Sequence, residues 1–238
     1  MQMTRDKLQT WGGLAALFEA LTYVVGFTAM AVWLDPGDTA GWDPTRRLAF
    51  VLERQTMFQS AHLMVYVAFG LALAPLTTAL HGHLSPGAEK FMRVASPFGY
   101  IWAGLVIASG MLASVGLSAV ASLQARDPAL ALVVWQMLSI VQDGLGGGVE
   151  VVGGVWVLLL SLVGPRVSVY SPVAWLGMVV GVSGVLTLVP PLRGLGMVFG
   201  LTQILWFTAI GVSLLRGSGK TQVDPSLRRS PAGSVPDH

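Results

Sequence analysis

Six long apolar stretches, separated by shorter polar segments, dominate the pattern of residues along the chain. They cover residues 11–34, 59–80, 96–120, 144–164, 172–190 and 194–215. About 20 mainly apolar residues in a helix cross the hydrocarbon core of a bilayer, and each stretch is close to or above that length. Apolar and polar residues do not alternate with a period of two, so helices are favoured over the strands of a barrel. The pattern predicts an all-α, polytopic membrane helix bundle with six transmembrane helices.

Composition supports a bilayer as the solvent of this chain. The 238 residues are 53% hydrophobic and only 11% charged, whereas about a quarter of a soluble domain is charged. The net charge is +2 and the basic residues are scattered, so we expect no nucleic-acid partner. The absence of cysteine excludes disulfides, iron–sulfur clusters and thiolate zinc sites. We expect no cofactor.

The first apolar stretch could be a signal peptide or a retained helix. Arg5 and Lys7 precede it, and the segment 29–31 (Ala-Met-Ala) resembles a signal-peptidase site. However, the stretch runs for 24 residues from Trp11 to Leu34 and carries Glu19 near its centre. Signal-peptide cores are shorter and rarely acidic, so we interpret it as a retained first helix.

The connections between the stretches predict an orientation. With six spans, nine of the lysines and arginines fall on the side of both termini and five on the other side. Positive residues concentrate on the cytoplasmic side, so both termini are predicted to be cytoplasmic. Residues 1–216 would form the membrane domain, and residues 217–238, rich in Ser, Pro and Gly, a disordered cytoplasmic tail.

Two Asp-Pro pairs mark helix starts on the predicted external side. Asp43-Pro44 and Asp127-Pro128 each place an N-cap residue before proline at the first helical position. We therefore expect helices two and four to begin there and to continue without a break into their spans. The extensions would pack through apolar residues of the two segments: Leu48, Phe50, Val51, Leu52, Leu130, Leu132, Val134 and Met137. Two separate helices lying in the membrane interface are the alternative.

Three glycine pairs occur at a spacing that lets membrane helices approach closely. The pairs are Gly144/Gly148, Gly177/Gly181 and Gly196/Gly200. Small residues four apart allow close backbone contact in lipid, so tight packing is predicted among the last three helices.

A few polar residues lie within the apolar stretches and form the candidate ion- or substrate-binding set. They are Glu19, Gln59, His62, Asp143, Glu150 and Gln203. In a continuous fourth helix, Asp143 and Glu150 are seven residues apart and share one face. Counted from the Asp-Pro starts, His62 and Glu150 differ by four residues in depth, about 6 Å, so they are predicted to pair.

This polar set has two interpretations. A charged group at membrane depth costs about 2.5–3.5 kcal/mol on insertion scales, so such groups face protein or water and mark function by default. Glu19, His62 and Glu150 could form a proton- or cation-responsive site. Alternatively, His62 and Gln59 hold helices together by hydrogen bonds while Glu150 stays neutral. We predict no metal site, because His62 is the only histidine within a predicted span.

Two segments resemble a known family. "GGVEVVGGVWVLLLSLVG" (147–164) and "GVSGVLTLVPPLRGLGMVFGLTQILWF" (181–207) are similar to bacterial, uncharacterised multi-pass membrane proteins grouped under a domain-of-unknown-function label. The resemblance implies about six spans and a location in the bacterial inner membrane. It implies no activity and no site residues.

These observations favour a small transporter or channel for a proton, cation or small solute. The alternative is a non-catalytic membrane subunit or assembly factor that binds a partner through its glycine-rich faces. An intramembrane enzyme has the least support, because no nucleophile and base can be placed together. The expected partners are the lipid bilayer and either further copies of this chain or a larger membrane complex, and the sequence does not identify the small molecule or ion.

Overall fold

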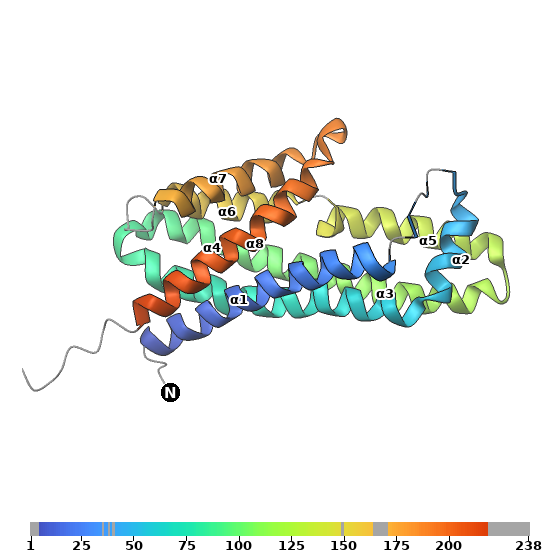
Figure 1. The fold of residues 1–238 in the computed structure, drawn as a ribbon, viewed down its shortest axis with the longest axis horizontal. Helices are drawn as coiled ribbons and strands as arrows, with labels where there is room; N and C mark the ends of the chain where they lie inside the picture. Colours follow the sequence, from blue (N-terminus) through green and yellow to red (C-terminus); the bar gives the residue numbers. More distant parts are fainter. Residues whose placement is uncertain are drawn as a thin grey trace, which may run out of the picture.

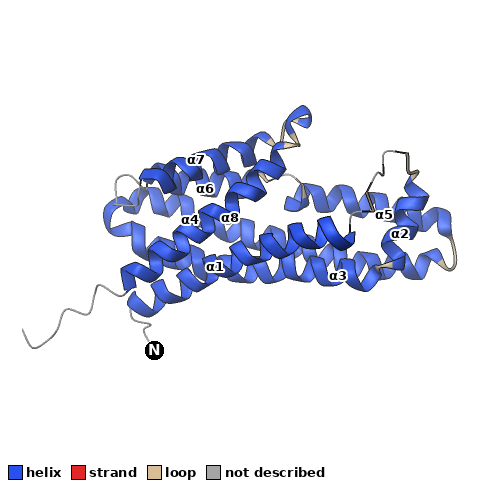
Figure 2. Ribbon diagram, viewed as in Figure 1, coloured by secondary structure: helices blue, strands red, loops and turns tan. Residues whose placement is uncertain are grey.

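The computed structural model describes residues 5–34, 36, 37, 39, 41–148, 150–163 and 171–218. Within these residues 92% are helical and no strand occurs, which confirms the all-α prediction (Figure 2). The predicted tail lies almost entirely outside the described residues.

In the part of the chain that the structure describes, eight α-helices form an elongated bundle (Figure 1). They are α1 (Arg5–Ala29), α2 (Pro44–Glu53), α3 (Gln55–His62), α4 (Phe69–Gln124), α5 (Pro128–Gln142), α6 (Val151–Val163), α7 (Ser171–Leu186) and α8 (Leu195–Ser218). Short π-helical segments follow α1, α3 and α5 at Met30–Leu34, Leu63–Ala68 and Asp143–Gly147, and a 3-10 turn at Pro190–Leu192 precedes α8.

Helix α4 consists of two antiparallel legs. Its backbone is non-helical at Ala88 (φ −153°, ψ 41°), where the chain reverses direction at one end of the bundle (Figure 1). Hydrogen bonds join the legs: His81 Nδ1 lies 2.7 Å from Ser96 Oγ, and the hydroxyls of Thr78 and Tyr100 are 2.9 Å apart. The second leg contains the predicted stretch 96–120, whereas the stretch 59–80 begins in α3, passes through the π-helical segment Leu63–Ala68 and ends in the first leg.

Among the described residues, four helical runs are long and apolar enough to cross a membrane, judged by length and composition. They are Asp6–Leu34, Gln55–Gln124, Pro128–Val163 and Leu195–Gly217, and Pro172–Leu186 is a shorter apolar helix. The run Gln55–Gln124 contains both legs of the α4 hairpin. These lengths and compositions are those of a helical membrane protein.

The two Asp-Pro helix starts are confirmed. The carboxylate of Asp43 accepts a hydrogen bond from the Arg46 N–H at 2.8 Å, and that of Asp127 accepts one from the Leu130 N–H at 3.0 Å. Each bond satisfies one of the free backbone donors at a helix N-terminus, as an N-cap does.

The segments that follow these caps pack together, as predicted. Leu48 of α2 is buried against Val120 and Ala131, and Leu132 and Val134 pack on the same cluster. The prediction was wrong for Leu130 and Met137, whose side chains are 46% and 59% exposed. They lie on the opposite face of α5.

The predicted continuity of these helices into their spans was wrong. Helix α2 ends at Glu53, and Arg54 (φ −113°, ψ 25°) separates it from α3. After α5 the chain passes through Gly146, whose φ of +102° is left-handed, before α6 begins at Val151. Glycine has no Cβ and adopts this conformation without steric cost, so the run Gly146–Gly148 lets the helix stop in mid-bundle.

A cluster of aromatic side chains fills the centre of the bundle. This aromatic cluster comprises Tyr23, Phe69, Trp102, Trp156, Phe199, Trp206 and Phe207. The ring centroids of Trp102 and Trp156 are 5.7 Å apart, and those of Trp156 and Trp206 are 5.8 Å apart. Edge-to-face and tilted pairs at this separation add to the stabilisation that burial of the rings provides.

Glycines allow the helices to close around this cluster. A Cβ at Gly153 would lie 2.5 Å from the Trp102 ring, and one at Gly181 would lie 2.8 Å from the Gly154 carbonyl oxygen. Gly177 and Gly181 thus lie in the contact of α7 with its neighbours, as predicted. No atom lies within 4 Å of the position that a Cβ at Gly144 would occupy. The Gly144/Gly148 pair therefore does not bring Gly144 into close contact with a neighbouring helix.

Candidate functional site

A cavity of about 470 Å³ is lined by residues of α1, α2, α3, α5 and α8, together with Glu150 directly before α6. Of these helices, α2, α3 and α5 lie on the right in Figure 1. Most of the cavity wall is aromatic or aliphatic: Tyr23, Phe27, Met30, Leu34, Val51, Phe58, Val65, Tyr66, Trp135 and Phe199. Its polar side chains include His62, Ser139, Gln142 and Glu150. Ligand sites commonly have about 300–1,000 Å³, apolar walls and a few polar groups, and this cavity has each of these features.

Glu150 lies where this cavity meets two smaller ones. The same residue lines cavities of about 100 Å³ and 210 Å³, both of which also contact Trp102. No other Asp or Glu among the described residues lines any of the three. A ligand in any of them would therefore meet the Glu150 carboxyl.

The local backbone explains how Glu150 reaches this position. The left-handed turn at Gly146 ends the helical segment, and Glu150 sits directly before α6. Its N–H donates a 2.8 Å hydrogen bond to Thr187 Oγ1, and the Thr187 hydroxyl donates to the Gly184 carbonyl at 2.6 Å. Thr187 is completely buried, so the start of α6 is attached firmly to the end of α7.

His62 lines the same cavity from α3. Its Nδ1 lies 2.7 Å from the Phe58 carbonyl oxygen, which can only accept, so Nδ1 carries a proton. The ring stacks on Tyr66 at a centroid distance of 5.7 Å. Among the described residues no hydrogen bond or ion pair joins His62 to Glu150. The two predicted partners share a cavity without direct pairing.

Gln59 belongs to a helix contact and not to the cavity wall. Its Nε2 donates to the Ser114 carbonyl at 2.9 Å and to Ser118 Oγ at 2.7 Å. These bonds attach α3 to the second leg of α4. Gln59 therefore has the structural role of the alternative interpretation, in which it holds helices together by hydrogen bonds.

Asp143 does not share a face with Glu150. Its side chain is exposed, and a Cβ at Gly148 would lie 3.1 Å from its Oδ1. The expected spacing assumed one continuous helix, and the turn at Gly146 removes that relation. The carboxyl of Asp143 therefore lies outside the cavity.

Glu19 and Gln203 lie deeper, in the centre of the bundle. Both side chains are 0% exposed, and none of their side-chain oxygen or nitrogen atoms has a hydrogen-bond partner among the described residues. The indole nitrogens of Trp102 and Trp156 are also buried without a hydrogen-bond partner among the described residues. All four side chains are buried within the bundle.

Sequence reasoning did not select Trp135, Ser139 and Gln142 for the site. They follow one another at spacings of four and three along α5 and all line the cavity. The same helical periodicity relates Phe58, His62 and Tyr66 on the opposite wall. This periodicity could have identified the face of α5 that lines the cavity. The seven-residue spacing of Asp143 and Glu150 instead led to the prediction that Asp143 lies on the site's face.

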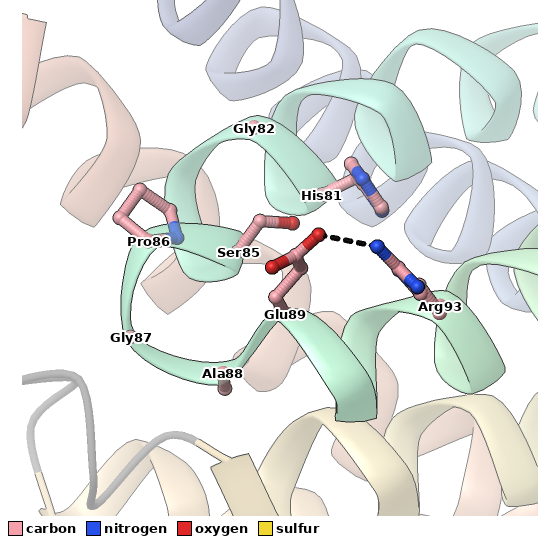
Figure 3. A pocket seen from close by; sticks show the side chains of 8 residues that line it. All are labelled: His81, Gly82, Ser85, Pro86, Gly87, Ala88, Glu89 and Arg93. Carbon is pink, nitrogen blue, oxygen red and sulfur yellow. Dashed lines mark hydrogen bonds and ion pairs between the residues drawn. The ribbon is translucent and has the colours of Figure 1, made fainter.

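A second hollow lies at the opposite end of the bundle, where α4 reverses (Figure 3). It has a volume of about 560 Å³, and its wall includes His81, Ser85, Glu89 and Arg93. Arg93 forms a 2.7 Å ion pair with Glu89, and both side chains are largely exposed. Since these charges already neutralise each other, this hollow is the weaker candidate. The described residues contain no group of three or more His, Asp or Glu that could hold a metal ion.

No family model matches the chain, and no match was found among curated proteins or solved structures. The resemblance to an uncharacterised bacterial membrane family stays a prediction.

Proposed function

We propose that this chain is a six-span protein of the bacterial inner membrane with both termini in the cytoplasm. The four apolar helical runs support this, because the α4 hairpin contributes two legs and Pro172–Leu186 adds a further apolar helix. The distribution of lysine and arginine supports the orientation. In this orientation the cavity of about 470 Å³ faces the external side.

We further propose that the protein transports a small, largely apolar solute that carries a positive charge. One observation carries this proposal: the Glu150 carboxyl lies at the junction of three cavities whose walls are mostly apolar. A carboxylate attracts a cation, and the faces of Tyr23, Tyr66 and Phe27 favour one as well. A small aromatic amine combines these properties.

The uneven distribution of space along the bundle favours transport over passive conduction. The cavity of about 470 Å³ reaches Tyr23 and Phe199 of the aromatic cluster, whereas the void next to Trp206 of the same cluster measures only about 20 Å³. A solute site near mid-membrane that is open to one side is one state of an alternating-access carrier. Helix breaks such as the one at Gly146 are found at such sites, where irregular backbone lines a cavity.

Uptake into proteoliposomes tests this function, with 2-phenylethylamine as the probe. We expect saturable uptake, weaker competition by the uncharged 2-phenylethanol, and a loss of about tenfold or more for Glu150→Gln, because hydrogen bonds to charged groups contribute about 1.5–3 kcal/mol. Asp143→Asn is the matched control, since its carboxyl is exposed and lies outside the cavity. Equal uptake by wild type and Glu150→Gln would exclude Glu150 as the binding group.

The alternative function, a subunit that binds a partner through glycine-rich faces, has less support. Gly181 packs against Leu158 and Gly154, and Gly200 packs against Phe27 and Tyr23. These glycines are covered within the chain and are not available to a partner. Isolation of the protein only as a complex with another subunit would favour this alternative.

A further inference from the structure

Glu19 is a carboxyl group that no described side chain or backbone group satisfies. It is 0% exposed, and neither of its oxygens has a hydrogen-bond partner. Gln203 is likewise 0% exposed with both its amide atoms unpaired. Buried polar atoms are nearly always hydrogen-bonded, so two such groups in one interior require an explanation.

The two residues lie on helices that pack together, Glu19 on α1 and Gln203 on α8. A Cβ at Gly13 would lie 3.0 Å from the Gly211 carbonyl oxygen, and one at Gly200 would lie 2.7 Å from the Phe27 ring. The two helices are therefore antiparallel. Glu19 lies between the first and second of these contacts on α1, and Gln203 lies between them on α8.

The chemistry of these side chains favours a proton on Glu19. An ionised carboxylate here would be a charge within the membrane, and an unpaired charge at that depth is costly. A neutral carboxylic acid avoids this cost, and its O–H group can still donate a proton to a neighbouring acceptor.

Tyr23 connects this interior with the cavities. It follows Glu19 by one helical turn on α1 and lines both the cavity of about 470 Å³ and that of about 100 Å³, next to Glu150. The ionisable groups that interact electrostatically with its hydroxyl are Glu150, Glu19 and Tyr66. A phenol hydroxyl both donates and accepts, so it can pass a proton between two carboxyls.

We propose that Glu19 is an intramembrane proton-binding site that exchanges its proton with the cavity through Tyr23 and Glu150. In the exchange, Glu19 gives its proton to the Tyr23 oxygen while the original Tyr23 proton passes to the Glu150 carboxylate. Tyr23 ends unchanged, and one proton has moved from Glu19 to Glu150. The proton site extends the proposed transport function. It depends on that function only where proton exchange is coupled to movement of the solute.

Infrared spectroscopy of the purified, reconstituted protein tests the proton site without any ligand. The carbonyl stretch of a neutral carboxylic acid is separate from that of a carboxylate and shifts in D₂O. At neutral pH we expect such a band in Glu150→Gln that is absent from the double variant Glu19→Gln, Glu150→Gln. The proposal is overturned if Glu150→Gln has no such band.

The exchange route has its own readout. After transfer to D₂O, we expect the Glu19 band of Tyr23→Phe to shift more slowly than that of wild type by about tenfold, the change that about 1.4 kcal/mol of added barrier gives. The amplitude of the band should not change. Tyr66→Phe is the control, since Tyr66 lies in the same cavity wall on another segment. Equal exchange in Tyr23→Phe and wild type would overturn the route through Tyr23.

The two proposals can fail separately. An intact Glu19 band in a protein that takes up no amine would contradict the transport function alone. Amine uptake that depends on Glu150, in a protein without a Glu19 band, would contradict the proton site alone.

Discussion

At the scale of single residues, the structure depends on a few groups that end or fix a helix inside the bundle. Gly146 provides the left-handed turn, and Thr187 holds the Glu150 N–H at the start of α6. Neither residue contacts a ligand in the proposed function, yet both determine where the Glu150 carboxyl lies.

Substitution of Gly146 by alanine should destabilise the protein. A non-glycine residue with φ near +102° is strained, and the cost is about 1–2 kcal/mol. We expect a lower thermal unfolding temperature in detergent and a matching loss of amine uptake. Gly144→Ala is the control, because no atom lies within 4 Å of its Cβ position and its backbone is not left-handed. Equal unfolding temperatures for the two variants would contradict this prediction.

Replacement of Thr187 by valine tests the attachment of α6 to α7. Valine has nearly the same shape but leaves the Glu150 N–H without its 2.8 Å partner. The expected loss of stability is about 1–3 kcal/mol, the cost of an unsatisfied buried donor. Thr202→Val serves as the control, since the Thr202 hydroxyl bonds only to its own helix at Val198 and Phe199. Similar denaturation midpoints for both variants would speak against the attachment.

At the scale of helices, the predictions succeeded where local chemistry decides the structure and failed where the breaks depend on packing. Asp43 and Asp127 cap their helices because the cap involves only the next few residues. The break after α5 was missed because glycine is also common in unbroken membrane helices. His62 and Glu150 line one cavity without the predicted pairing, and the missed break led to the wrong assignment of Asp143 to the face of Glu150.

Close packing of α6 on α4 provides a prediction at this scale. A methyl group at Gly153 would lie 2.5 Å from the fully packed Trp102 ring. Gly153→Ala should therefore cost about 1–3 kcal/mol through overpacking. Gly104→Ala, where no atom lies within 4 Å, should be neutral or stabilising. Tryptophan fluorescence should also change in Gly153→Ala alone, and unchanged emission together with unchanged stability would contradict the contact.

At the scale of the whole molecule, the two ends of the bundle differ, so the orientation of the protein in the membrane can be tested. The α4 reversal lies at one end, and the α2–α5 contact lies at the other. The chain has no native cysteine, so single cysteines can be introduced cleanly. We expect an impermeant thiol reagent to label Thr45→Cys in intact cells and Lys90→Cys only after the membrane is opened. The reverse labelling pattern would place the cavity of about 470 Å³ on the cytoplasmic side.

The α4 hairpin also has a consequence for how the protein is made. Its legs are joined by Thr78–Tyr100 and His81–Ser96, partners close in sequence, so this hairpin can form soon after it leaves the ribosome. Helix α1 packs against this hairpin and also against α8, the last of the described helices to be synthesised. We therefore expect the face of α1 that packs on α8 to contact lipid or the insertion machinery until α8 arrives. The bundle is complete only when this last contact forms.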